Sequence, residues 1–365
     1  MKKTVLYEKH LALKAKMAPF GGYEMPIQYE SVIKEYQACR SKAAIFDTCH
    51  MGVFEIAGSG AVSDLERILS CDVTDMKHGT CRYGLICNEK GGVIDDQIIY
   101  RSDNDRFLMV VNASTKEGDF EWIESHISKN TTLKDVSAKN AKIDLQGTLA
   151  PKIASSLLRN SPINEMKYYS FGSAFYGEEQ IMISRTGYTG EIGFEIYGKP
   201  DLISRLWDDC VSLGAAPAGL GARDILRLEM GFPLYGHELS SERNAAQSGF
   251  SRAVSRKKEF IGSNAVLDPS AETQLLIGIA IDGRRSTRQN DIIVDESGRD
   301  VGVITSGAFS PALGYAIALG YVNKRYSVTG TPLKIISGKN ELCGTVSLPP
   351  FYKNATARAD MMKYL

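Results

Sequence analysis

The chain has 365 residues, and its 43 basic and 43 acidic side chains give a formal net charge of zero. This balance argues against nucleic acid as a partner, because nucleic-acid-binding domains usually carry a strongly basic surface. A single hydrophobic core rarely serves more than about 250–300 residues, so the length predicts two or three domains.

The N-terminus and the cysteines indicate the compartment. The segment MKKTVLYEKHLALKAKM has charges that interrupt each apolar stretch, so it lacks a signal-peptide core. No later run approaches the ~20 apolar residues that span a bilayer. The seven cysteines include no CxxC pair and the five histidines are dispersed, which favours reduced thiols and no metal site. We therefore expect a cytoplasmic protein without a metal or a membrane partner.

Helical and strand patterns alternate over the first 230 residues. Helical spacing predicts a helix over 31–44, and FDTCHMGVFEIAGSG then alternates as a strand does. Three β-type runs separated by turn residues predict a meander over 81–113. A hairpin pattern covers 180–198. Further helices are expected at 64–69, 116–129, 151–158, 201–213 and 221–230.

The C-terminal quarter differs in composition. A polar stretch with no clear period covers 259–273, and the chain beyond it is almost purely β. Short, regularly spaced strands with Gly, Asp and Ser turns predict a small barrel or sandwich of about 90 residues. The predicted fold class is therefore α+β with an all-β tail domain.

The run GGVIDDQIIY at 91–100 places an acid in an apolar row. Side chains alternate along a strand, so Asp96 shares a face with apolar and aromatic side chains while Asp95 points to the other face. An unpartnered carboxylate in such a row is costly to desolvate, so Asp96 is expected either to be held by donors or to face a ligand cavity. A structural aspartate held by backbone amides fits the pattern about equally well.

The run SRTGYTGEIGFEIY at 184–197 contains three glycines spaced G-x-x-G-x-x-G. Glycine permits positive φ and a close approach of the backbone to a planar ligand, and Gly187 and Gly190 are expected to form a turn. The spacing matches neither a dinucleotide site nor a P-loop. Glu195 lies between two apolar residues, and its carboxylate suits the adjacent N–H donors of a 2-amino-4-oxo pterin edge. A solvent-facing glutamate in a hairpin is the alternative, and the pattern alone favours it.

The run GLGARDILRLE at 219–229 predicts a helix with two arginines on one face. Arg223 lies in the first turn, where the helix dipole disfavours a cation, so a binding role is indicated. Its planar fork suits a carboxylate such as a folate tail. An ordinary salt bridge to Asp224, to Glu229 or to a neighbouring strand is the alternative.

A hydrolase interpretation finds little support. His50 and His237 lie in loop-like contexts, and no GxSxG elbow is present. Cys49 is adjacent to His50, but nothing in the sequence lowers its pKa. These residues are more typical of structural loop positions than of a nucleophile and its base.

Taken together, these segments resemble the T-protein (aminomethyltransferase) family of the glycine cleavage system over nearly the whole chain. The matching stretches are YEKHLALKAKMAPFGGYEMPIQY, FDTCHMGVFEI, LICNEKGGVIDDQIIYR, FLMVVNAS, SRTGYTGEIGFEIY, GLGARDILRLEMGFPLYGHEL and SGAFSPALGYAIALGYV. The resemblance implies a multi-domain, folate-binding cloverleaf with a C-terminal all-β barrel. Residues 1–265 would form the folate-binding region from two interleaved α+β subdomains, and 274–365 the barrel domain.

The resemblance also implies an activity and a site. Such proteins take an aminomethyl group from the lipoyl arm of H-protein, release ammonia and form 5,10-methylenetetrahydrofolate. Asp96 would be the catalytic acid, Glu195 a pterin ligand and Arg223 a further folate contact. Positions that line the folate cavity in the family correspond to Tyr83, Asn112 and Tyr188.

Two loops depart from the family pattern. Residues 240–249 read SSERNAAQSG and lack the usual Ile-Thr-Pro loop and Glu-Ala-Gly step, and residues 286–291 replace a Pro-Arg-His-Gly turn. These changes bear on the donor and on H-protein docking more than on folate binding. A tetrahydrofolate-dependent demethylase of a small methylated donor and a non-catalytic folate-binding relative therefore stay open. A basic run, Arg252, Arg256, Lys257 and Lys258, is a candidate dock for an acidic carrier, although most such runs are solvated faces.

Overall fold

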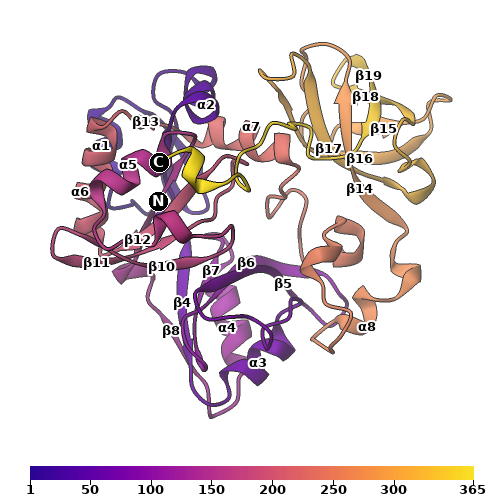
Figure 1. The fold of residues 1–365 in the computed structure, drawn as a ribbon. Coiled ribbons are helices and arrows are strands. Elements are labelled where there is room, and N and C mark those ends of the chain that lie inside the picture. Colours follow the sequence, from indigo (N-terminus) through magenta and orange to yellow (C-terminus); the bar gives the residue numbers. More distant parts are fainter.

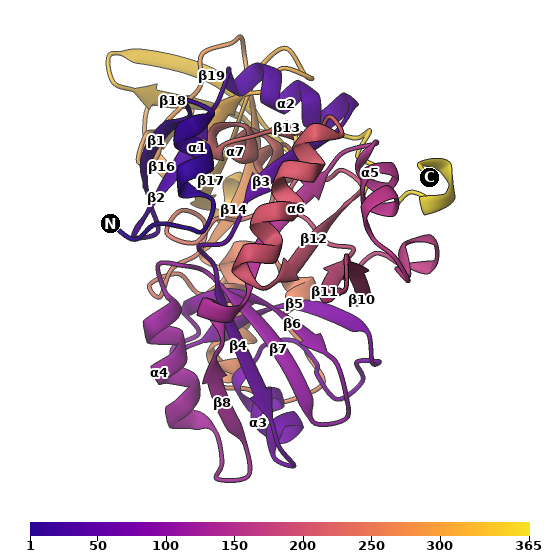
Figure 2. The same ribbon diagram turned by 90° about the vertical axis from the view of Figure 1, so that its left-hand side faces the viewer.

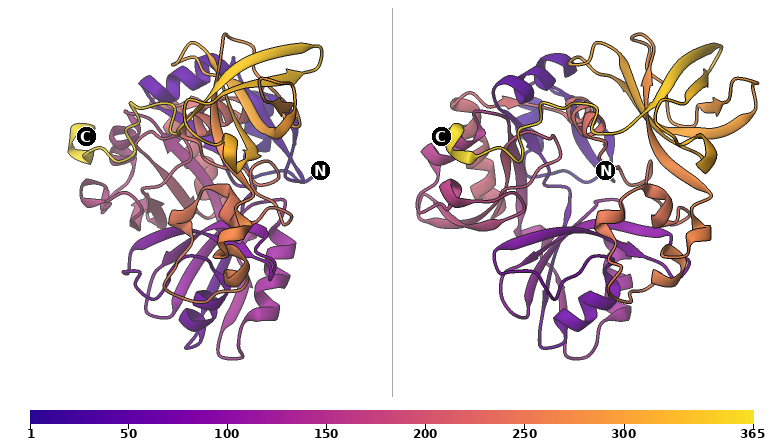
Figure 3. Two further views of the ribbon diagram at one scale, coloured as in Figure 1. Left: turned by 90° about the vertical axis from the view of Figure 1, so that its right-hand side faces the viewer. Right: turned by 45° about the vertical axis from the view of Figure 1, so that its right-hand side comes forward.

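The computed structural model describes the backbone of residues 1–365 and every side chain except that of Ser251. Three parts of the chain lie around a common centre: two sheets with their helices, and a closed barrel (Figures 1 and 3). In the right-hand view of Figure 3 the barrel is at the upper right, with the two sheets at the left and at the bottom. The predicted α+β class with a C-terminal barrel is confirmed.

The first sheet has six strands in the order β10-β11-β12-β9-β3-β13. These strands are β3 (Ala44–Asp47), β9 (Ala141–Gln146), β10 (Phe171–Tyr176), β11 (Glu179–Ser184), β12 (Gly193–Gly198) and β13 (Ala216–Pro217). The same part of the chain contains α1 (Tyr7–Ala12), the hairpin of β1 (Lys16–Phe20) and β2 (Tyr23–Gln28), α2 (Val32–Ser41), α5 (Ala150–Leu157), α6 (Pro200–Ser212) and α7 (Leu220–Met230). Its core is formed by apolar side chains of β9, β12, α5 and α6.

The second sheet is inserted between two strands of the first. The chain leaves the first sheet after β3 and returns to it at β9, which interleaves the two parts. The inserted strands, in the order β5-β6-β7-β4-β8, are β4 (Gly52–Ala57), β5 (Thr80–Cys87), β6 (Val93–Arg101), β7 (Arg106–Val111) and β8 (Thr132–Asp135). One face of this sheet is covered by α3 (Ala61–Ile68) and α4 (Lys116–His126) (Figure 2).

The barrel closes in the order β14-β17-β16-β15-β18-β19 around an apolar interior. Its strands are β14 (Gln274–Ile281), β15 (Ile292–Val294), β16 (Asp300–Phe309), β17 (Ala316–Asn323), β18 (Pro332–Ser337) and β19 (Asn340–Ser347), preceded by α8 (Ser263–Val266). The chain after β19 runs back to the first sheet, where Met361 is buried in its core and the tail lies beside α5 (Figure 2).

Apolar contacts join the three parts in a ring. The rings of Tyr100 on β6 and Tyr197 on β12 meet edge to face at 5.9 Å, which joins the two sheets. Leu228 of α7 packs against Ile317 and Leu319 of the barrel. The segment before the barrel packs Phe260 and neighbouring apolar side chains against β5. Side chains on the inner faces are therefore held by two parts of the chain at once.

The predicted helices are present, with shifted ends. The helix expected over 31–44 ends at Ser41, because Ala44–Asp47 instead pairs with β9 and β13. Local spacing does not show where long-range strand pairing takes over. The polar stretch 259–273 contains the short helix α8, which no period indicated. Of the helices in the described residues, none is long and apolar enough to cross a membrane.

Candidate functional site

Asp96 lies on the inward face of β6, the second strand of its sheet. Asp96 pairs with Leu85 of β5, and β7 pairs with β6 from Ile98 onward, so the sheet fixes the direction of the Asp96 side chain. The hydroxyl of Tyr83 donates to Oδ2 of Asp96 at 3.1 Å, and Nδ2 of Asn112 donates to Oδ1 at 2.9 Å. The carboxylate is partly exposed and each of its oxygens accepts one side-chain bond, so a lone pair on each remains for a ligand.

The surroundings of Asp96 favour its protonated form more than water does. Burial and the charge of Asp95 raise the pKa of Asp96 to about 7, although the bonds from Tyr83 and Asn112 act in the opposite direction. A carboxyl group with this pKa exchanges a proton near neutral pH. Such a group is suited to general acid–base work.

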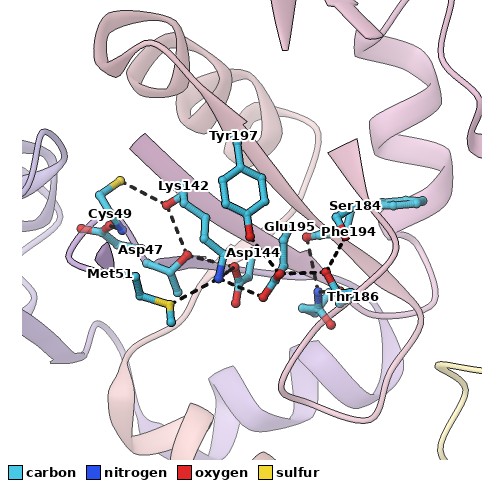
Figure 4. Close-up of polar contacts among 12 residues, drawn as sticks. Asp47, Cys49, Met51, Lys142, Asp144, Ser184, Thr186, Phe194, Glu195 and Tyr197 are labelled. Atoms are coloured by element: carbon cyan, nitrogen blue, oxygen red, sulfur yellow. Dashed lines mark hydrogen bonds and ion pairs between the residues drawn. The ribbon is translucent and has the colours of Figure 1, made fainter. Parts of the chain in front are cut away.

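Glu195 lies on β12 and is almost completely buried, so the solvent-facing alternative is wrong. Its Oε1 accepts from Nζ of Lys142 at 2.9 Å. Its Oε2 accepts from Thr186 at 2.7 Å and from Tyr197 at 3.1 Å (Figure 4). Tyr100 of β6 also donates to Oε2, at 3.1 Å. The two adjacent N–H donors of a pterin edge therefore cannot each bond to one oxygen of Glu195 while this network is intact. Only one lone pair, on Oε1, remains for a ligand.

Lys142 joins Glu195 to a second buried acid. Its Nζ lies 2.9 Å from Glu195 and 3.2 Å from Asp144, and both carboxylates are buried (Figure 4). Asp144 also accepts from Nη1 of Arg223 at 2.7 Å. Burial alone would raise the pKa of Asp144, but the charges of Lys142 and Arg223 hold it below its usual value. Two cations and two anions thus neutralise each other inside the protein.

Arg223 makes the salt bridge to a neighbouring strand that the sequence left open as an alternative. It lies on α7, and its side chain is 15% exposed. The guanidinium stacks over the ring of Tyr188 at 4.9 Å, and Tyr188 stacks on Phe232 and donates its hydroxyl to the carbonyl of Pro233. The position of Tyr188 is therefore set by α7 and by the segment that follows it.

The six side chains selected from the sequence fall into two groups of contacting residues, which β6 brings to one face of its sheet. Tyr83 and Asn112 contact Asp96 directly. Tyr100, four residues along the same face of β6, contacts Glu195. From Glu195 the network continues through Lys142 and Asp144 to Arg223 and Tyr188.

Comparison with known proteins identifies the family of this chain over nearly its whole length. The GCVT N-terminal domain matches residues 6–258, and the glycine cleavage T-protein C-terminal barrel domain matches residues 275–353. The chain belongs to the glycine cleavage T-protein family.

Full-length relatives agree with this assignment. The chain is 40% identical to an aminomethyltransferase of Symbiobacterium thermophilum, with 98% of this chain and 99% of that protein covered, and 37% identical to one of Thermotoga maritima, with 98% and 100% covered. It superposes on the crystal structure of glycine cleavage system aminomethyltransferase T from Bartonella henselae with a TM-score of 0.91, 30% identity and 97% and 99% coverage. The predicted enzyme class, an aminomethyltransferase of the T-protein family, is confirmed.

The three glycines of this T-protein do not serve the purpose expected from their spacing. A Cβ at Gly187 would meet the side chain of Gln146, one at Gly190 that of Met230, and one at Gly193 the backbone of β9. Only Gly190 has a positive φ, of 80°. The glycines therefore allow close packing of this segment against β9 and α7.

Sequence reasoning missed the polar face of β9. Lys142, Asp144 and Gln146 alternate with apolar residues, and all six residues of the strand are buried. A buried face that carries only polar side chains needs partners, because each such group is costly to bury alone. This alternation was the available signal for the Lys142 network of the T-protein site.

The basic run at 252–258 contains one lysine that is bonded to the second sheet and three exposed side chains. Nζ of Lys258 donates to the backbone carbonyls of Glu66, Leu69 and Cys71 and pairs with the carboxylate of Glu66 at 2.6 Å. Lys258 therefore ties the segment before the barrel to the second sheet, and its inclusion in a docking patch is wrong. Arg252, Arg256 and Lys257 are exposed.

The histidine and cysteine near the site are structural in their contacts. His50 is buried against the rings of Phe20 and Tyr23, and burial lowers its pKa to about 4. Cys49 donates its thiol to the carbonyl of Lys142, and burial raises its pKa well above the usual value. Neither is prepared to act as a base or a nucleophile at neutral pH. Within the described part of the chain, no group of three His, Cys, Asp or Glu side chains is placed to hold a metal ion.

Proposed function

We propose that this aminomethyltransferase transfers the one-carbon unit of aminomethyl-lipoyl H-protein to tetrahydrofolate, with release of ammonia and formation of 5,10-methylenetetrahydrofolate. The observation that carries the proposal is the environment of Asp96. Its carboxylate is directed by Tyr83 and Asn112, retains free lone pairs and has its pKa raised to about 7. Such a group both accepts ligand N–H donors and exchanges protons at neutral pH.

The side chains around Asp96 fit a reduced pterin with an acidic tail. Tyr83 and Tyr188 supply aromatic surface, and Arg223 supplies a partly exposed guanidinium for a carboxylate. Tetrahydrofolate supplies the nitrogen nucleophiles that accept the carbon. We propose that Glu195 contributes one acceptor, Oε1, and otherwise fixes the side chains of Tyr100 and Lys142 that form the wall of the site.

The side chains of the proposed site have two tasks: they position the reactants, and they move a proton. Asp96 orients the acceptor through its free lone pairs and takes or gives the proton that accompanies loss of ammonia. Tyr83 and Asn112 restrict the carboxylate to one direction, so little reorganisation is needed. Holding both reactants in one site supplies most of the acceleration, because it converts a bimolecular step into an effectively unimolecular one.

The contacts of the two loops that depart from the family support a role for them in recognising the donor. Residues 240–249 bond to the turn before β6: the N–H of Val93 donates to the carbonyl of Ser240 at 3.0 Å, and that of Ala245 to Gly91 at 2.9 Å. In residues 286–291, Gln289 donates to the carbonyl of Gly236 at 3.0 Å. We propose that these loops and the exposed Arg252, Arg256 and Lys257 form the side from which the carrier enters.

The proposed reaction is tested by incubating the protein with tetrahydrofolate and aminomethyl-loaded H-protein and measuring ammonia. Ammonia release that requires both reactants is expected. Tight folate binding without ammonia, but with turnover of a small methylated compound, would replace this proposal by the demethylase. Folate binding without any turnover would favour a non-catalytic folate protein.

The pH dependence of the rate is expected to follow Asp96, with a midpoint near 7. Replacement of Tyr83 by Phe removes a bond that favours the ionised carboxylate, so the midpoint should move to higher pH. Measuring kcat from pH 5.5 to 9 checks this. Tyr176→Phe is the matched control, because it removes a tyrosine–carboxylate bond at the far edge of the first sheet, to Asp209, and should leave the midpoint unchanged. An unshifted or lowered midpoint in Tyr83→Phe would contradict the assignment.

A further inference from the structure

A second carboxylate lies behind Asp96, on the other face of the same strand. Because side chains alternate along β6, Asp95 points away from the inward face and toward α4. There it meets Asp119 of α4, and both residues have zero exposed surface. Two adjacent buried carboxyl groups do not both ionise, because neither water nor a cation offsets the repulsion.

The hydrogen-bond donors around the two acids decide which one carries the charge. Asp95 accepts from the backbone N–H of Asn112 at 3.0 Å through Oδ2 and from its Nδ2 at 2.8 Å through Oδ1. Neither oxygen of Asp119 accepts a well-formed hydrogen bond from a described residue, and the nearby hydroxyl of Thr115 only partly opposes its raised pKa. A carboxylate that accepts two N–H bonds is stabilised as the anion, whereas a buried carboxyl group without donors is stabilised as the neutral acid. Burial raises the pKa of both acids, but the donors on Asp95 favour its anion and their absence on Asp119 favours its neutral acid.

This assignment also gives the proton of Asp119 an acceptor. A protonated Asp119 is a donor, and the acceptor beside it is Asp95. Burial and the charge of Asp95 raise the pKa of Asp119 to about 10, in agreement with the donor count. The pair then holds one proton and one negative charge across the neutral range.

Asn112 connects this pair to the site. Its Nδ2 group has two hydrogens and donates to Oδ1 of Asp95 at 2.8 Å and to Oδ1 of Asp96 at 2.9 Å. The backbone bond from Asn112 to Asp95 fixes the asparagine as well. A shift of Asp95 would therefore move the amide that directs Asp96.

We propose that Asp119 and Asp95 are positioning residues that share one proton behind the site and, through Asn112, fix both the direction of the Asp96 carboxylate and the single negative charge beside it. The inference rests on the proposed role of Asp96 in the reaction. Besides the pair and Asn112, the titratable groups that face Asp96 are Tyr83 on β5, Tyr188 in the β11–β12 loop and Tyr235 after α7. These tyrosines are neutral at pH 7 because burial raises the pKa of each.

The test is a carbon-13 NMR titration of the full-length protein labelled at the aspartate carboxyl carbon, with signals assigned by Asp→Asn replacement. The signal of Asp119 should remain that of a protonated acid up to pH 8. Asp95→Asn removes the neighbouring charge and should lower the midpoint of Asp96 by about one pH unit or more. Asp119→Asn keeps a neutral donor to Asp95 and should leave that midpoint in place. The pH–rate profiles of the same variants should shift in parallel.

Asp64→Asn is the matched control. Asp64 is a buried acid of the same layer, held by Ser128 and Thr131, so its replacement disturbs the core without changing the charge beside Asp96. An Asp96 midpoint that stays fixed in Asp95→Asn, or that falls in Asp119→Asn as far as in Asp95→Asn, would overturn the proposal. Because the titration needs no substrate, it separates this inference from the transfer reaction: absent ammonia release with the expected titrations would refute only the proposed function.

Discussion

Replacement of Asp96 by Asn is expected to lower kcat for ammonia release by about 10²–10⁴-fold, the range typical of a lost general acid–base group. The amide has nearly the same shape and its oxygen still accepts from Tyr83 or Asn112, so the fold and the surrounding bonds should persist. What the amide lacks is a proton that it can exchange near neutral pH. Folate binding, measured by calorimetry, should weaken much less than kcat falls.

The control for this replacement is Asp105→Asn. Asp105 lies in the exposed turn between β6 and β7, so the same chemical change occurs in the same sheet without touching the site. It should retain full activity. Full turnover by Asp96→Asn with folate bound would show that Asp96 does not move the proton, and the proposed mechanism would then fail.

Replacement of Lys142 by Met is expected to reduce the free energy of unfolding by about 3–5 kcal/mol, because it leaves buried acids without their shared cation. The side chain of Lys142 is 2% exposed and lies between Glu195 and Asp144. Arg223 still pairs with Asp144, so the larger part of the loss should come from Glu195. Urea unfolding in a Trp122→Phe background measures this loss of stability. Trp207 of α6 is then the only tryptophan, so it reports the unfolding of the first sheet alone.

Two variants make this second prediction specific. Lys199→Met removes an exposed lysine that pairs with Glu179 in the same part of the chain, and its effect should be much smaller because the pair is solvated. Adding Glu195→Gln to Lys142→Met removes the stranded charge, so the double variant should lose less than the sum of the two single losses. Strictly additive losses would mean that Lys142 and Glu195 do not stabilise each other.

Strand alternation assigned the two acids of β6 correctly. Asp95 and Asp96 point to opposite faces, as the two-residue period requires, and this is a local property of any strand. The same reasoning identified an acid between apolar residues at Glu195. It favoured a solvent-facing glutamate there, because a strand pattern contains no information about what covers its second face. The cover is β6 of the other sheet, whose Tyr100 reaches Glu195 from 95 residues away.

The arginine of α7 illustrates a different limit. Its place in the first turn of a helix indicated a partner, and the helix is where it was predicted. The partner is Asp144 on β9, 79 residues earlier in the chain. Spacing reveals that a charge needs a partner, but only the packing of α7 against the first sheet selects the partner.

The sequence by itself determined the α+β class, an all-β C-terminal domain, the resemblance to the T-protein family and the candidate acids Asp96 and Glu195, because local periodicity and motif order are properties of the chain itself. The tertiary structure decided the burial of Asp95, Asp96 and Asp119 and the pairing of Lys142, Asp144, Glu195 and Arg223. Those properties depend on burial and on neighbours brought together by the interleaving of two sheets, and the energy of a charge is set by these surroundings.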